Sequence, residues 1–117
     1  MVVFGLSSAI CQEQSKTNGV VVLVKYKTQP SKSSEALVEL KKLIEKVKQE
    51  QHFVTIKLHV DQVDDSNILL YEKWADESYY KNQHMKTEHL QQFINKSREF
   101  LAGPPEISFW KLDSEYE

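Results

Sequence analysis

Residues 71–93 read YEKWADESYYKNQHMKTEHLQQF, and this stretch decides the fold. Glu72 and Trp74 lie at the end of a predicted strand, and His84 lies at the end of the helix predicted after it. His89 follows a short break and begins a second helix. A small domain seldom places a Glu, a Trp and two His in one strand–turn–helix unit for packing alone. The stretch therefore predicts both the order of the secondary-structure elements and the residues of a candidate functional site.

Strand patterns flank this unit on both sides. Residues 20–27 (VVVLVKYK) form a nearly unbroken β-branched run, which is typical of a central strand covered on both faces. Residues 53–61 alternate, and the turn cluster after them leads to a returning strand at residues 68–74. Residues 106–112 close the set as a fourth strand. The alternation predicts that one face of the second strand carries Val54, Ile56, Leu58 and Val60.

Helical periodicity fills the intervals between the strands. Residues 35–50 carry an apolar stripe at helical spacing opposite a charged face. Asp76 is placed to cap a helix at residues 77–84, and Thr87 is placed to cap another that runs to residue 101. The order β-α-β-β-α-β, with the second helix broken, predicts an α+β ferredoxin-like sandwich with one antiparallel sheet. Its helices cover one face, and we expect a second copy of the chain to cover the other.

The central stretch resembles a known family signature, E-x-W followed after about ten residues by H-x4-H-x3-F. The matching positions are Glu72, Trp74, His84, His89 and Phe93. The signature is that of the antibiotic biosynthesis monooxygenase (ABM) family, and the resemblance extends over roughly residues 19–113. It implies a homodimer in which two sheets form a dimeric α+β barrel, with the C-terminal strand of each subunit often reaching over its neighbour. It also implies chemistry close to that of the quinol monooxygenases.

The length predicts a single domain, and the resemblance implies that it is an ABM-like domain at residues 19–113, between a flexible extension (1–18) and a tail (114–117). Residues 1–10 are apolar, but no Lys or Arg precedes Lys16, so an extension is favoured over a secretory leader and cytoplasmic residence is the default. The net charge of −2 comes from interspersed charges, which disfavours nucleic acid, and no apolar run is long enough to span a membrane. The single Cys11 excludes an internal disulfide and a cysteine metal cluster.

His84 is the strongest candidate for a catalytic base, because an imidazole with a pKa near ~6.5 can accept a proton at neutral pH. The alternative is a histidine that stabilises the C-terminal end of its helix. Glu72 shares a strand face with Trp74 and could orient His84 or accept a substrate hydroxyl, but it could equally pair with Lys25 or Lys57. The resemblance places Trp74 against the substrate, whereas packing alone would also explain it.

Other side chains are predicted to border the same pocket. Tyr80 lies one helical turn before His84 and shares its face. Tyr26 and Phe93 could supply apolar walls, although core packing is their ordinary role. His89 fits the second, mainly structural, histidine of the family. Because it lies five positions after His84, the two do not form the i, i+4 pair of a zinc protease, and we predict no metal.

The leading hypothesis is a monooxygenase that needs no cofactor and acts on a small aromatic phenol or quinol. No glycine-rich phosphate loop or dinucleotide fingerprint occurs in the sequence, so no cofactor is predicted. The haem-degrading branch is disfavoured because the first strand lacks the Asn of that branch. Two alternatives remain: a non-catalytic dimer that binds a small ligand or another protein, and a sugar-phosphate isomerase with Lys25 or Lys73 in its pocket.

Overall fold

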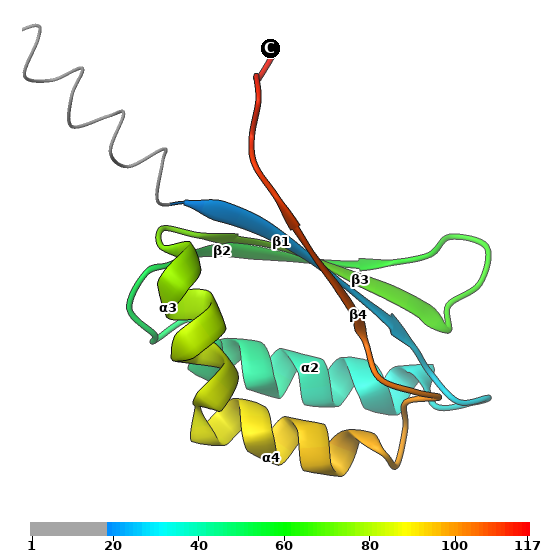
Figure 1. The fold of residues 1–117 in the computed structure, drawn as a ribbon. Coiled ribbons are helices and arrows are strands. Elements are labelled where there is room, and N and C mark those ends of the chain that lie inside the picture. Colours follow the sequence, from blue (N-terminus) through cyan, green and yellow to red (C-terminus); the bar gives the residue numbers. More distant parts are fainter. Residues whose placement is uncertain (1–18) are drawn as a thin grey trace, which may run out of the picture.

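The computed structural model describes residues 19–117, and it has one four-stranded antiparallel sheet with helices against one face (Figure 1). The strand order is β2-β3-β1-β4, which confirms the predicted α+β ferredoxin-like fold. The elements along the chain are β1 (Val20–Lys27), α2 (Ser33–Val47), β2 (Phe53–Val60), β3 (Asn67–Trp74), α3 (Glu77–Asn82), the 3-10 turn η1 (His84–Lys86), α4 (Glu88–Ser97) and β4 (Glu106–Trp110).

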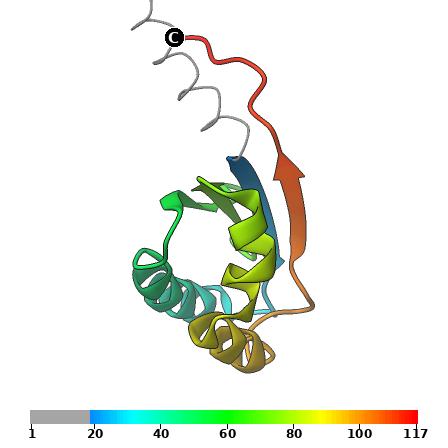
Figure 2. The same ribbon diagram turned by 60° about the vertical axis from the view of Figure 1, so that its left-hand side comes forward.

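The core lies between the sheet and the helices. On β1 the alternation of side chains buries one face completely, and on α2 the buried residues recur at helical spacing. Figure 2 shows the helices of residues 19–117 gathered on one side of the sheet, and none of these helices lies on the opposite side. The residues buried from these two elements are Val20, Val22, Val24, Tyr26, Ala36, Leu40, Leu43 and Val47.

Two side-chain caps define the break before α4. The carboxylate of Asp76 accepts a hydrogen bond from the backbone N–H of Tyr79 at 3.1 Å, and Thr87 Oγ1 accepts from the N–H of Leu90 at 3.4 Å. Between the two helices, η1 turns the chain so that His84 is buried, with 4% of its surface exposed. The predicted helix of residues 77–84 therefore ends at Asn82, and His84 belongs to the turn that follows.

The last helix is shorter than predicted, because the backbone N–H groups of Glu99 and Phe100 donate three residues back, to Lys96 and Ser97, in a turn tighter than an α-helix. α4 ends at Ser97 rather than at residue 101. The side-chain amide of Gln29 donates to the carbonyl oxygens of Arg98 and Leu101, at 2.9 and 3.0 Å. The backbone N–H of Gln29 donates to Phe100 at 2.9 Å. These long-range bonds satisfy carbonyl groups in the turn that follows α4, and the sequence pattern of the helix does not contain them.

A β-bulge changes the predicted face of one residue in β2. The register shifts between Phe53 and Thr55, so that Phe53 faces the core against Trp74 while Val54 is half exposed. The prediction that Val54 shares a face with Ile56 was therefore wrong. Strict alternation holds only from Thr55 onward.

The last residues of the chain extend away from the domain after β4 (Figures 1 and 2). Within residues 19–117, no helix is long and apolar enough to cross a membrane. The expectations for residues 1–18, namely the flexible extension, the leader and the unpaired Cys11, lie outside the described residues.

Candidate functional site

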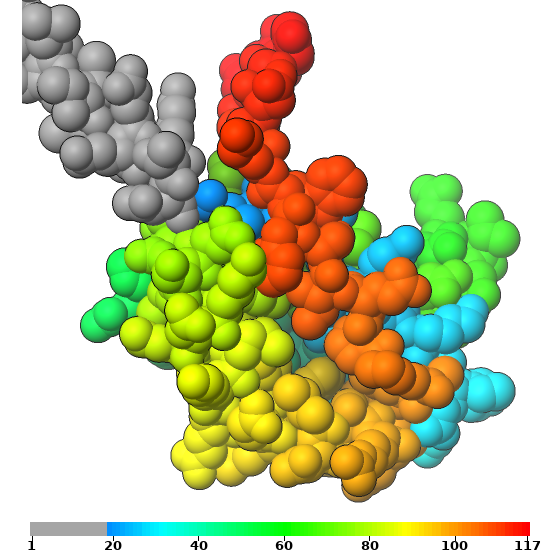
Figure 3. Space-filling view, viewed as in Figure 1, coloured from blue at the N-terminus to red at the C-terminus, as the bar shows by residue number. Residues whose placement is uncertain are grey.

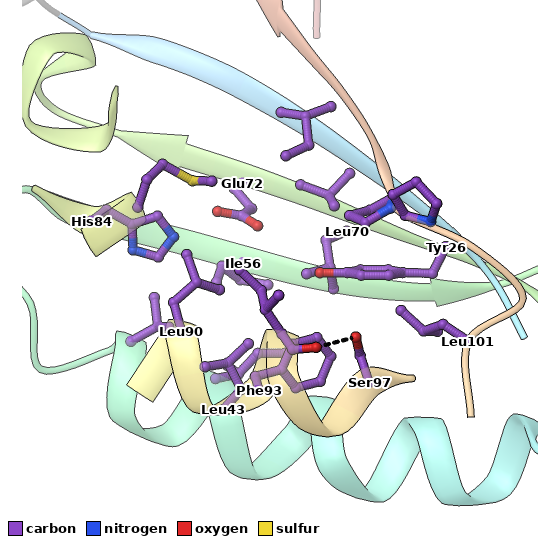
Figure 4. A pocket seen from close by; sticks show the side chains of 18 of the residues that line it. Tyr26, Leu43, Ile56, Leu70, Glu72, His84, Leu90, Phe93, Ser97 and Leu101 are labelled. Atoms are coloured by element: carbon purple, nitrogen blue, oxygen red, sulfur yellow. Dashed lines mark hydrogen bonds between the residues drawn. The ribbon is translucent and has the colours of Figure 1, made fainter. Parts of the chain in front are cut away.

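A cavity of about 580 Å³ lies between the sheet and the helices α2 and α4. Figure 4 shows its side chains, and Figure 3 shows the surface hollowed between β4 and the helical side of the molecule. Most of the lining is apolar, with the polar groups at few positions. The lining comprises Val24, Tyr26, Leu43, Ile44, Val47, Ile56, Leu70, Glu72, Tyr80, His84, Met85, Leu90, Phe93, Ile94, Ser97, Arg98, Leu101, Ala102, Gly103, Pro104, Pro105 and Ile107.

His84 borders the cavity and is held from behind. Its Nδ1 lies 3.1 Å from Oε1 and 3.0 Å from Oε2 of Glu50, so Nε2 is the ring nitrogen left for the cavity. The imidazole packs between the rings of Trp74 and Tyr80, at centroid distances of 4.6 and 4.7 Å. Burial lowers the pKa of His84 below its usual value, although the charge of Glu50 and its hydrogen bond act in the opposite direction. The imidazole is therefore neutral at neutral pH, as a proton acceptor must be.

Glu72 is a second polar group in the cavity wall, and it is 4% exposed. Its Oε1 accepts a hydrogen bond from Nε1 of Trp74 at 2.9 Å. Burial raises the pKa of Glu72 to about 7, the charge of Glu50 adds to the rise, and the Trp74 hydrogen bond opposes it. Near neutral pH this carboxyl group can therefore either donate or accept a hydrogen bond.

The alternative partners considered for Glu72 lie on the wrong side of the sheet. Lys25 pairs in register with Leu69, and Lys57 pairs with Tyr71. Side chains alternate along β3, so the positions of Leu69 and Tyr71 face away from that of Glu72. Lys57 instead places its Nζ over the ring of Tyr71, at 5.6 Å.

Trp74 is fully buried and is not among the residues that line the cavity. Its indole stacks on Tyr79 at 5.9 Å and meets Phe53 edge-on at 5.7 Å. Trp74 therefore packs behind Glu72 and His84 and does not itself line the cavity, and its contact with a substrate stays a prediction.

Three further predicted residues line the cavity, and one does not. Tyr26, Tyr80 and Phe93 all face it. Burial raises the pKa of both tyrosines, so their hydroxyl groups stay protonated and can donate. His89 lies outside the cavity, with its Nε2 2.6 Å from Oε2 of Glu50, and it borders a separate surface groove between α2 and α4.

Glu50 is the functional-site residue that the sequence did not reveal. It lies between α2 and β2, in the polar run KVKQEQH, and no motif or periodicity in this run distinguishes Glu50 from a surface carboxylate. It lies 34 positions from His84, and no spacing rule links residues so far apart. Among residues 19–117, no group of three or more His, Cys, Asp or Glu side chains is arranged to hold a metal ion.

Comparison with known proteins places this arrangement in a family. The model of the family described as "Antibiotic biosynthesis monooxygenase" matches residues 19–96. The chain belongs to the ABM family. The sequence resemblance carried by Glu72, Trp74 and His84 is therefore confirmed.

Relatives in sequence and structure extend over most of the chain. "Putative monooxygenase YcnE" of Bacillus subtilis is 30% identical over 89 residues, which cover 75% of this chain and 93% of YcnE. The uncharacterized protein sll1783 of Synechocystis is 27% identical over 93 residues, or 80% of this chain, which spans only 63% of that longer relative. A conserved protein from Methanosarcina mazei Go1 has the same fold, with a TM-score of 0.75 at 23% identity over 86% of this chain and 97% of its own.

Proposed function

We propose that this protein is a monooxygenase that oxidises a small aromatic phenol or quinol without a cofactor. The proposal rests on one observation. His84 is buried and bound at Nδ1, and its other ring nitrogen, Nε2, is left for the apolar cavity that it borders. Membership of the ABM family and the similarity to YcnE support the same class of reaction.

In the proposed step, Nε2 of His84 accepts the proton of the substrate hydroxyl as an electron leaves the ring for O2. A phenol with a pKa near ~10 does not lose its proton to His84 in the ground state. The two transfers are therefore coupled, because loss of the electron makes the hydroxyl strongly acidic. One oxygen atom forms a bond to a ring carbon, and the other leaves as water with the proton held by His84 and the proton that the same ring carbon loses. A hydroquinone plus O2 yields a hydroxyquinone plus water, with all four electrons supplied by the substrate.

The size and polarity of the cavity define the substrate class further. An apolar cavity of ~150 Å³ accepts a benzene molecule, whereas this one measures about 580 Å³. A bicyclic hydroxyarene such as a naphthol or naphthohydroquinone therefore fits better than a single ring. Glu72 and the tyrosine hydroxyls would bind its oxygen atoms, while Phe93 and Leu90 would contact its carbon skeleton.

The test is oxygen uptake by the purified protein with a panel of naphthols and hydroquinones, in comparison with His84→Ala. Loss of a positioned general base lowers kcat by roughly 10²- to 10⁴-fold. Asn95→Ala, which removes an exposed side chain from α4 away from the cavity and from the helix-free sheet face, is the control and retains wild-type turnover. Equal turnover by the His84→Ala variant would contradict the role of His84, and no uptake with any substrate would contradict the proposed reaction.

The second part of the proposal is a homodimer, formed across the sheet face that carries no helix. The half-buried Val21, Leu23 and Tyr71 lie on that face, and Trp110 at the end of β4 is 55% exposed. A second copy that covers this face would bury them, as the family resemblance implies. A monomeric mass in solution at micromolar concentration would contradict the dimer.

A non-catalytic dimer that binds a small apolar ligand is the alternative favoured by one observation, the largely apolar lining of the cavity. It predicts a thermal shift with naphthols but no oxygen uptake. The isomerase hypothesis requires a basic group in the cavity, but Lys25 and Lys73 lie on the opposite face of the sheet from Glu72. Among the described residues, the basic side chain that borders the cavity is the exposed Arg98.

A further inference from the structure

Glu50 is a buried carboxylate in a segment that the family signature does not include. Its side chain is 6% exposed, and groups from three different elements surround it. The hydroxyl of Tyr79 in α3 donates to Oε1 at 2.9 Å. Nδ1 of His84 in η1 lies 3.0 Å from Oε2, and Nε2 of His89 in α4 lies 2.6 Å from the same oxygen. Three side chains therefore bind one carboxylate at short distances.

An ionised carboxylate can only accept hydrogen bonds, so each ring nitrogen that contacts Glu50 must carry a proton. For neutral His84 this requirement selects the tautomer protonated at Nδ1 and leaves the lone pair on Nε2. We propose that Glu50 is the positioning residue of the site, and that it fixes the tautomer and orientation in which His84 presents a proton-accepting Nε2 to the cavity.

The charges around His84 support the same assignment. Glu50 lies on its Nδ1 side, Glu72 of β3 lies in the cavity wall, and the neutral phenol of Tyr80 in α3 packs on the ring. When His84 takes up a proton, the negative charge of Glu50 stabilises the imidazolium that forms. This catalytic part of the inference rests on the proposed function, whereas the tautomer of His84 does not.

His89 holds Glu50 in place from the solvent side. The side chain of His89 is 20% exposed and borders the surface groove together with Lys46 and Lys96. With His89 and Tyr79 both bound to it, Glu50 cannot turn away from His84 without breaking two hydrogen bonds. The second histidine of the family signature therefore acts on the cavity through Glu50, which explains why it lies outside the cavity.

The test is nuclear magnetic resonance of ¹⁵N- and ¹³C-labelled histidine, which reports the tautomer and the titration midpoint of each of the four histidines. In the wild-type protein at pH 8, His84 is expected to show the Nδ1–H tautomer. Because the charge of Glu50 and its hydrogen bond raise the pKa of His84, Glu50→Gln is expected to lower the midpoint by about one pH unit or more. Glu39→Gln is the matched control, because Glu39 is an α2 carboxylate bound to Lys42 and Lys96 away from the cavity.

Turnover provides the second measurement. Glu50→Gln is expected to lower kcat on the order of 100-fold with KM nearly unchanged, since it weakens the base and not the walls of the cavity. The acid limb of the pH profile moves to lower pH together with the midpoint of His84. Glu50→Asp, which keeps the charge, is expected to restore part of kcat and part of the shift in the titration midpoint of His84.

The inference is overturned if wild-type His84 carries its proton on Nε2, a result that needs no variant to fold. It is also overturned if Glu50→Gln lowers the melting temperature but does not change the titration midpoint of His84, because Glu50 would then contribute only to stability. An absence of oxygen uptake by the wild-type protein would contradict the proposed function and leave this inference standing.

Discussion

The cavity wall and the segment behind it each contain a buried carboxyl group close to His84, and the two groups differ in their hydrogen-bond partners. Glu72 in the wall has one donor, the indole N–H of Trp74. Glu50 behind the wall contacts Tyr79, His84 and His89. Both are almost inaccessible to solvent, so burial alone does not distinguish them.

The two carboxyl groups differ in the number of hydrogen-bond donors that contact them, and this number decides what each group can do. With one donor, the cost of desolvation dominates at Glu72, and the group retains a proton near neutral pH. It therefore remains available to a ligand. With three partners, Glu50 is fully occupied by the protein and acts on its neighbours instead. The structure thus separates a carboxyl group that lines the cavity from one that is bound to side chains behind the cavity wall.

The largest expected effect concerns the stability contributed by Glu72. Its folded-state pKa is raised from 4.5 to about 7, so between these values the folded protein binds a proton that the unfolded chain has released. Stability therefore falls as the pH rises from about 5 to about 8, by up to about 3 kcal/mol at 1.36 kcal/mol for each pKa unit. Glu72→Gln is expected to remove this loss and to be more stable than the wild-type protein at pH 8.

Urea unfolding at several pH values between 5 and 8 measures this effect. His84, whose pKa is lowered, contributes a slope of the opposite sign, so the difference between variant and wild type isolates Glu72. Glu106→Gln on the exposed part of β4 is the control and leaves the slope unchanged. If Glu72→Gln had the same slope as the wild-type protein, Glu72 would be ionised in the folded state.

The second effect has the opposite sign. Glu50→Gln replaces an acceptor of three hydrogen bonds by an amide with only one oxygen, so some partners lose their acceptor. Loss of a hydrogen bond to a charged group costs about 2 kcal/mol, and we expect a decrease of this size at pH 8 by urea unfolding. A Glu50→Gln variant as stable as Glu72→Gln at pH 8 would contradict the distinction between the two groups.

The smallest effect is expected from Tyr79→Phe, which removes one donor from Glu50 and leaves the ring in contact with Trp74. The expected loss is about 1 kcal/mol, again by urea unfolding. Because His84 and His89 still bind Glu50, the tautomer of His84 should not change. A change of tautomer in this variant would mean that Tyr79, rather than Glu50 as a whole, determines the orientation of the imidazole.

Local rules were sufficient to predict the fold from the sequence. The β-branched run of β1 and the caps at Asp76 and Thr87 are each encoded within a few residues, and the structure contains the strand and both caps. The errors arose where distant residues intervene. After Ser97 the chain tightens into a turn whose carbonyl groups bind the distant Gln29, and a bulge after Phe53 exposes Val54.

The candidate site shows the same division. The spacing of Glu72, Tyr80 and His84 along one strand and the helix after it places them near one another, and the structure brings all three to one cavity. Glu50 could not be found in this way, because its link to His84 depends on how α2 packs against α4. Its neighbours in sequence are ordinary exposed polar residues, and only the tertiary structure distinguishes it from them.

The most direct test of the central claim is a crystal structure of the protein with 1-naphthol bound in the absence of oxygen. We expect the ring within the cavity and the hydroxyl oxygen ~2.6–3.2 Å from Nε2 of His84, with Nδ1 still bound to Glu50. A naphthol bound with its hydroxyl at Ser97 or Arg98, far from His84, or bound outside the cavity altogether, would contradict it.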